Sequence, residues 1–196
     1  MCDEDLRVAV DGVKEILEPL LQGVAPQELY KVSVYVEGIW KAFLSGGRDP
    51  EVLAERALPA IRNSLLFARR NLEMALNKAL ECLVMRPRSS SRADEERRAR
   101  ALKSTLDRLA DPSSAMLEHY RTSSDPLSKY LVAGAWGHQY LLSRGIDLED
   151  FDQGLCQALG CGDSPEGRLV LSYSRLCRAL DAVEEAAERA LAGDRS

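Results

Sequence analysis

The stretch "PAIRNSLLFARRNLEMALNKALECLVMR", Pro59 to Arg86, decides the fold class of this chain. Its apolar residues recur every three or four positions, which is the spacing of one face of an α-helix. They form a seam with a mean period of 3.5, as in coiled coils: Ile61, Leu65, Ala68, Leu72, Ala75, Ala79 and Cys82. At about 1.5 Å per residue, such a helix is about 42 Å long. We therefore predict one long central helix over 59–86.

The same helical spacing continues on both sides of this stretch. Apolar stripes run through residues 6–17, 29–43, 99–109 and 169–187, and prolines and glycines separate most of them. No segment alternates apolar and polar residues over the length of a strand. The sequence therefore predicts an all-α fold, an antiparallel helical bundle of seven to nine helices joined mainly by short loops.

The domain organisation follows from length and from one break. A chain of 196 residues suits a single domain with a buried core. The break is "RPRSSSR", Arg86 to Arg92, where a proline and three serines stand without an apolar anchor. We expect one all-α domain over 1–196, with a mobile Arg/Ser loop at 86–93 between a helical half at 1–86 and another at 94–193.

Charge and hydropathy limit the partners and the location. The net charge is −5, which argues against a general binder of polyanions. No apolar run approaches the roughly 20 residues that cross a bilayer. The beginning, "MCDEDLRVAV", is acidic, whereas a secretory signal begins with basic residues and an apolar core. We expect a soluble, cytoplasmic protein with no membrane association.

Several chemistries lack their residue patterns. The five cysteines are scattered and odd in number, so we expect reduced thiols rather than a disulfide framework. The sequence contains no Cys-x-x-Cys, Glu-x-x-His or His-x-x-x-His spacing for a metal. It also lacks a Gly-rich phosphate loop, a nucleophile elbow and a kinase signature. We expect no metal and no cofactor, and the sequence leaves enzymatic activity undecided, with catalysis disfavoured.

One basic segment stands out against the acidic background. Residues 86–108 carry eight basic and four acidic side chains. A flexible Arg/Ser loop that leads into an Arg-rich helix is suited to phosphate contacts. The favoured alternative is a solvated helix face on which acids pair with arginines one turn away. The candidate nucleic-acid-binding residues are Arg86, Arg88, Arg92, Arg97, Arg98, Arg100 and Lys103.

A second stretch, "AGAWGHQYLLSRG" at 133–145, places glycines and a histidine inside a helical pattern. On a helix over 126–144, Gly134 and His138 fall on the apolar stripe. One interpretation is a close helix crossing with a partly buried histidine, which we favour because single core histidines are common. The other is a ligand pocket over the glycine. The candidate pocket residues are His119, Gly134, Trp136, His138 and Tyr140.

Three functional hypotheses follow from these patterns. The first is a non-enzymatic helical bundle that acts by protein–protein interaction, as a homo-oligomer or a subunit of a complex. It rests on the seams at 59–86 and 169–187 and on the lack of catalytic signatures. The second is a nucleic-acid-associated accessory protein that uses residues 86–103. The third is a ligand-binding or enzymatic bundle built around His119 and His138.

Overall fold

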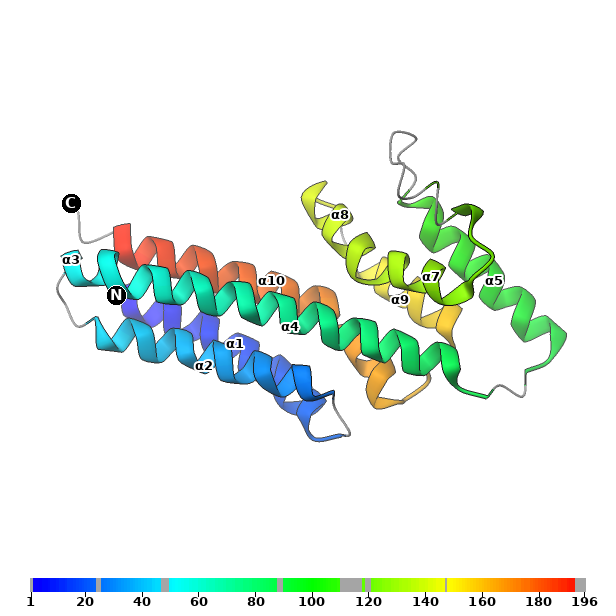
Figure 1. The fold of residues 1–196 in the computed structure, drawn as a ribbon, viewed down its shortest axis with the longest axis horizontal. Helices are drawn as coiled ribbons and strands as arrows, with labels where there is room; N and C mark the ends of the chain where they lie inside the picture. The colour runs from blue at the N-terminus through cyan, green and yellow to red at the C-terminus, as the bar shows by residue number, and fades with distance from the viewer. Residues whose placement is uncertain are drawn as a thin grey trace. The chain divides into compact units, whose positions relative to one another are not determined.

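The computed structural model describes residues 2–23, 26–46, 50–87, 90–109, 118, 121–146 and 148–192. Every regular element within these residues is a helix, as Figure 1 shows. The prediction of an all-α fold is therefore confirmed. None of the described helices combines the length and the apolar character that a membrane span requires.

The chain divides into two compact units, each described separately. Unit 1 comprises residues 1–75 and 175–196, and unit 2 comprises residues 76–174. Unit 1 contains α1 (Cys2–Leu21), α2 (Gln27–Ser45), α3 (Pro50–Val52), the π-helix η1 (Leu53–Ala57), the first part of α4 (Leu58–Met85) and the last part of α10 (Pro165–Ala192). Unit 2 contains the remainder of α4 and α10, with α5 (Arg92–Asp107), α7 (Pro126–Leu131), the π-helix η2 (Val132–Trp136), α8 (Gly137–Ser143) and α9 (Glu149–Leu159).

This grouping differs from two consecutive halves at 1–86 and 94–193. The difference arises because the C-terminal part of α10 packs with the N-terminal helices. Of the Arg/Ser loop expected at 86–93, residues 88–89 lie outside the described part of the chain. On either side of these two residues, α4 ends at Met85 and α5 begins at Arg92.

Most of the predicted apolar stripes are buried faces of helices, but in the stripe at 99–109 Ala99 is exposed, Leu102 and Leu106 are half-buried and only Leu109 is buried. In α1 and α2 the stripes at 6–17 and 29–43 are buried. The long helix covers 58–85, one residue from the predicted 59–86, and its seam is buried from Ile61 to Ala79, whereas Cys82 is exposed. The seam of α10 from Leu169 to Ala187 is buried as well. Both seams therefore pack within this chain.

Ion pairs align α10 antiparallel to α4 in unit 1, as the two ribbons in Figure 1 also show. Arg69 Nη2 lies 2.8 Å from Asp181 Oδ1 and 2.5 Å from Glu184 Oε2, and Arg62 reaches Glu188 at 3.5 Å. Burial alone would lower the pKa of Arg69. The hydrogen bonds that Arg69 donates to Glu184 and Asp181, and the charges of these carboxylates, outweigh burial, so its pKa lies above the ordinary value. These contacts fix the register of the two helices.

Two π-helical segments interrupt the regular helices. The first, η1, ends just before Pro59, and the Leu58 N–H bonds to Leu53 O. A proline ring clashes with the carbonyl four residues earlier in an α-helix, and the wider π-turn provides room. The helical backbone therefore continues from η1 through Pro59 into α4. The second, η2, contains Gly134 with the non-helical angles φ −74° and ψ −114°, so the helix predicted over 126–144 is not continuous.

Candidate functional site

His138 lies at the centre of a buried polar cluster in unit 2. Its Nδ1 lies 2.6 Å from Gly134 O, and its Nε2 contacts Asp152 Oδ1. The Ser174 hydroxyl donates to Asp152 Oδ2. All three side chains are buried. We call this arrangement the His138–Asp152–Ser174 cluster, and it ties α8, α9 and α10 together.

The hydrogen-bond partners fix where the protons of the cluster lie. A carbonyl oxygen only accepts, so Nδ1 of His138 carries a proton and donates it to Gly134 O. A second proton lies between Nε2 and Asp152 Oδ1, because the lone pairs of these two atoms would repel each other without a shared hydrogen. The Ser174 hydroxyl completes the set on the second carboxylate oxygen. Each polar side-chain atom of the cluster therefore has a partner, as buried polar groups require.

The cluster contains the three residue types of a hydrolytic triad without its geometry. In a triad the serine contacts the histidine, which takes its proton. Here Ser174 donates to Asp152, and the histidine contacts the other carboxylate oxygen. The ring of His138 is also enclosed by the edges of Phe151 and Tyr173, with centroids at 4.9 and 4.6 Å. This arrangement supports packing of unit 2 rather than nucleophilic chemistry.

The space beside Gly134, where the sequence allowed a pocket, is occupied. A Cβ at this position would overlap Leu80 of α4 and lie 3.7 Å from Leu76. The glycine therefore permits a close helix crossing, which was the favoured interpretation of the stretch. Trp136 and Tyr140 are half-buried and stack on each other, with ring centroids 5.6 Å apart.

His119, the remaining pocket candidate, lies outside the described residues. The structure therefore gives no geometry for a pair with His138, and that part of the pocket interpretation stays a prediction. Asp152, the side-chain partner of His138, and Ser174, which donates to Asp152, were not predicted from the sequence. Their signal was weak, because a polar residue on a buried stripe is visible only once the helix bounds are known.

Acids among the described residues engage three of the seven candidate residues in the arginine-rich segment. Ser91 caps the N-terminus of α5 and accepts a hydrogen bond from the Asp94 N–H at 3.3 Å. The Ser91 hydroxyl in turn donates to the Asp94 carboxylate and lowers its pKa. Arg92 pairs with Glu96 at 3.3 Å and Arg97 with Asp94 at 2.5 Å, as expected for a solvated helix face. Arg86 pairs with Glu166 at 2.5 Å.

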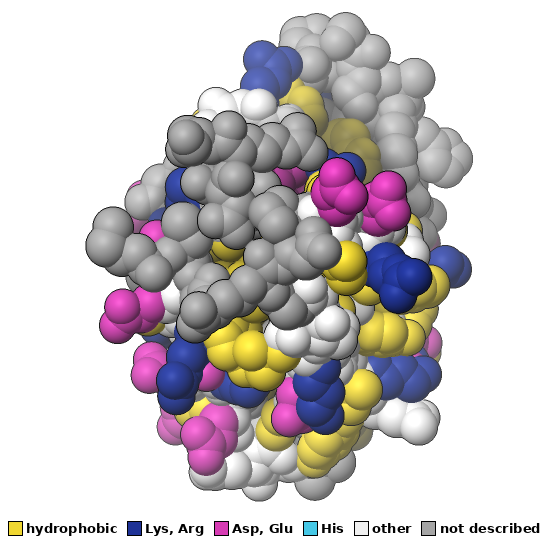
Figure 2. Space-filling view, turned by 90° about the vertical axis from the view of Figure 1, so that its left-hand side faces the viewer, with side chains coloured by type: hydrophobic (Ala, Val, Ile, Leu, Met, Phe, Trp, Pro, Cys, Tyr) yellow, Lys and Arg dark blue, Asp and Glu magenta, His cyan; other side chains and the backbone are white. Residues whose placement is uncertain are grey.

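The other candidates of this segment differ among themselves. Arg98 lies against the C-terminal end of α9, where a Cβ on Gly160 would be 3.0 Å from its Nη2. A cation at this end complements the helix macrodipole. Arg100 and Lys103 form no ion pair with a described residue, and Arg88 lies outside the described part. Figure 2 does not bear on this segment, because it faces the left-hand side of Figure 1, where helices of unit 1 end; basic, acidic and apolar side chains are interspersed there.

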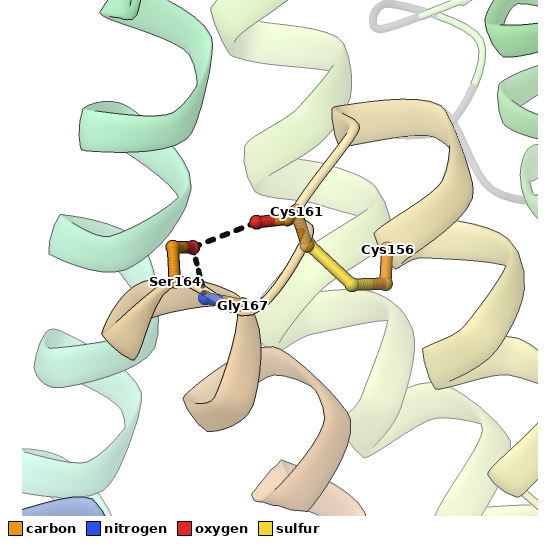
Figure 3. The surroundings of a disulfide bond; sticks show 4 residues. All are labelled: Cys156, Cys161, Ser164 and Gly167. Atoms are coloured by element: carbon orange, nitrogen blue, oxygen red, sulfur yellow. Dashed lines mark hydrogen bonds between the residues drawn. A yellow bond between two sulfur atoms is a disulfide. The ribbon is translucent and has the colours of Figure 1, made fainter.

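Two cysteines are joined, contrary to expectation. Cys156 and Cys161 form a disulfide at the end of α9, shown in Figure 3. The expectation of reduced thiols is wrong for this pair. Cys82 and Cys177 carry thiols rather than a disulfide. The spacing of Cys156 and Cys161 does not match Cys-x-x-Cys, but a helix C-terminus brings positions five apart together.

Unit 1 presents an apolar surface that the sequence analysis did not identify. Tyr35 of α2 stacks on Phe67 of α4 at 5.4 Å, so the two helices are neighbours here. Val34 is 68% exposed and Phe67 is 43% exposed. Met74 is exposed as well and lies two turns after Phe67 on the same side of α4. We call this surface the α2–α4 face; its residues are Lys31, Val34, Tyr35, Phe67, Arg70 and Met74. Its two cations have no acidic partner among the described residues.

Comparisons with known proteins give no family for this chain. No family model matches it, and neither a curated protein nor a solved structure is similar enough to count as a match. Function is therefore argued from the described geometry alone.

Proposed function

We propose that this chain is a non-enzymatic helical bundle that acts by protein–protein interaction, and that its partner is a second copy of itself. The carrying observation is the α2–α4 face, where Val34 and Phe67 are exposed on adjacent helices. Aromatic residues and methionine are enriched at protein interfaces. The seams that first suggested association no longer support it, because they are buried within the chain.

The choice of a second copy rests on charge complementarity. The outer stripe of α1 combines an exposed valine with carboxylates at helical spacing: Glu4, Val8, Asp11, Glu15 and Glu18. Val8 is 66% exposed, and the only exposed cation of α1, Arg7, pairs with Asp11 at 3.8 Å. The α2–α4 face instead carries the cations Lys31 and Arg70, which pair with no acid among the described residues. Docking α1 of one copy on this face of another pairs the opposite charges and buries apolar side chains from both.

The expected assembly is a closed one. Each copy offers both surfaces, so a two-fold axis that pairs them reciprocally gives a dimer. Without that axis the same contact is head-to-tail and adds further copies. The proposal therefore predicts association whose strength falls with salt, because part of it is electrostatic.

The test is the mass of the assembly across protein concentrations, by native mass spectrometry and sedimentation. We expect wild-type oligomers, and we expect monomers for both Val34→Glu and Val8→Glu, because each buries a charge in the contact. Ile146→Glu is the matched control, since Ile146 is 47% exposed in unit 2 and should leave the assembly intact. A wild-type monomer at all concentrations contradicts the proposal, as do oligomers that survive both valine changes.

Nucleic-acid binding is the alternative, supported by Arg100 and Lys103 on α5, which have no acidic partner among the described residues. Replacing both by Ala should weaken any salt-sensitive binding of a DNA or RNA oligonucleotide. The matched control replaces Arg92 and Arg97, which already pair with Glu96 and Asp94. Equal losses in both double variants, or no binding at low salt, count against this alternative. The ligand-binding alternative around His138 gains no support, because that side chain is buried and fully bonded.

A further inference from the structure

The C-terminal turn of α9 places two cysteines in register. Gly160 adopts a left-handed conformation at φ 65°. The Cys161 N–H bonds to Cys156 O at 3.1 Å and the Gly160 N–H bonds to Gln157 O at 3.3 Å. These two bonds define a Schellman motif, in which the residues flanking the turn come into contact. The Cα atoms of Cys156 and Cys161 are 5.2 Å apart, within the range that a disulfide bridges.

The turn is held by bonds that do not involve sulfur. Besides the two backbone bonds, the Ser164 hydroxyl donates to Cys161 O at 2.8 Å. The Gly167 N–H donates to the Ser164 hydroxyl at 3.0 Å, and Figure 3 shows this chain of bonds beside the disulfide. Breaking the sulfur–sulfur bond leaves all of these in place. The two thiols therefore remain within bonding distance after reduction.

The two sulfurs differ in their access to solvent. Cys161 is buried at 4% exposure, whereas Cys156 is half-buried. A shallow depression of about 330 Å³ lies over the pair, and no charged side chain is among its described lining residues. A small thiol or disulfide can enter it without charge repulsion and reaches Cys156 first.

We propose that Cys156 and Cys161 form a reversible exchange site for low-molecular-weight disulfides. In oxidation, the Cys156 thiolate attacks one sulfur of the external disulfide, whose bond breaks and releases one external thiolate. The Cys161 thiolate then attacks Cys156 Sγ and expels the second external thiolate. Two protein thiols are thus oxidised to one disulfide, and the external disulfide is reduced to two thiols. Reduction runs through the same steps in reverse. This site does not depend on the proposed self-association.

The experiment uses the full chain and oxidised glutathione as the probe. The native protein is reduced with dithiothreitol, freed of reductant, and equilibrated with the probe before intact mass and peptide mapping. In the wild type we expect the 156–161 peptide to lose two hydrogens and keep no glutathionyl group. The exposed, single Cys82 should keep one, which shows that the probe reacts.

Two variants separate the attacking from the resolving sulfur. Cys161→Ser should trap glutathione on Cys156, exceeding the wild-type level about tenfold or more, because the neighbouring thiol that resolves it is gone. Cys156→Ser should leave Cys161 a free thiol. Circular dichroism checks that each variant keeps its helix content.

Three results overturn the proposal. The first is a disulfide that dithiothreitol reduces only after the chain is unfolded. The second is a pair that stays reduced while Cys82 is modified. The third is a glutathionyl group that persists on Cys156 in the wild type, because it shows that Cys161 does not resolve it.

Discussion

Replacing Asp152 with Ala is expected to destabilise unit 2 strongly. The change removes the carboxylate that joins His138 to Ser174. Both remaining side chains are fully buried, so they lose their hydrogen-bond partner without becoming exposed to bulk water. Each unsatisfied buried polar group costs about 1–3 kcal/mol, and removing one partner of a buried pair costs about 3–5 kcal/mol. We therefore expect a loss of about 3–5 kcal/mol in the free energy of unfolding.

The isosteric change Asp152→Asn should cost much less. An amide N–H can donate to Nε2 of a neutral His138, and the amide oxygen can still accept from the Ser174 hydroxyl. The bonds are kept and only their charge assistance is lost, so we expect about 1.5 kcal/mol or less. The order of the two variants thus reports on hydrogen bonding rather than on side-chain volume.

Urea unfolding, monitored by tryptophan fluorescence, can measure this loss for unit 2 separately. The chain has two tryptophans, with Trp40 in unit 1 and Trp136 in unit 2. In a Trp40→Phe background, fluorescence follows unit 2 alone. The matched control is Asp150→Ala, an exposed carboxylate in the first turn of the same helix, where only about 0.3–1 kcal/mol is expected from the macrodipole. Equal losses for Asp150→Ala and Asp152→Ala would refute the role given to the cluster.

Further expectations concern two glycines and two carboxylates. Gly134→Ala should destabilise the fold by about 1–3 kcal/mol, because the new methyl group overlaps a neighbouring helix. Gly12 has open space around it, so Gly12→Ala should stabilise helix α1 by up to about 1 kcal/mol. Thermal unfolding compares the two variants. NMR titration should place the carboxyl pKa of Asp94 and Asp125 below the ordinary 3.8, because serine hydroxyls donate to both. The stabilisation by these lowered pKa values is complete above that ordinary value and disappears as the pH falls through the lowered ones; an unshifted pKa contradicts these bonds.

The fold class followed from periodicity because burial of one helix face leaves a regular mark in the sequence. The seam from Ile61 to Ala79 is buried as expected, and Asp125 caps α7 before Pro126, as the Asp-Pro pair predicts. Pro19 does not end the first helix, because α1 continues to Leu21. The proline removes one backbone bond, but only two residues of the helix follow it, so the disturbance is confined to the last turn.

The site-level features were less visible, because they join residues from different helices. Nothing in the local pattern links His138 to Ser174, which lies on another helix. The acidic run at 147–152 is typical of a first helical turn, where carboxylates complement the macrodipole. This account suits exposed Asp150 but not buried Asp152. The Cys156–Cys161 pair was accessible in principle, since Gly160 marked the helix end. Combining that end with the geometry of a Schellman turn would have placed the two sulfurs together.

Sedimentation of the full-length chain beside Val34→Glu, Val8→Glu and Ile146→Glu tests the proposed function most directly. Self-association through the α2–α4 face and α1 predicts an oligomer for the wild type and for Ile146→Glu. The same proposal predicts monomers for Val34→Glu and Val8→Glu. Helix content should be the same in all four samples. A wild-type monomer, or four samples of identical mass, would contradict the proposal.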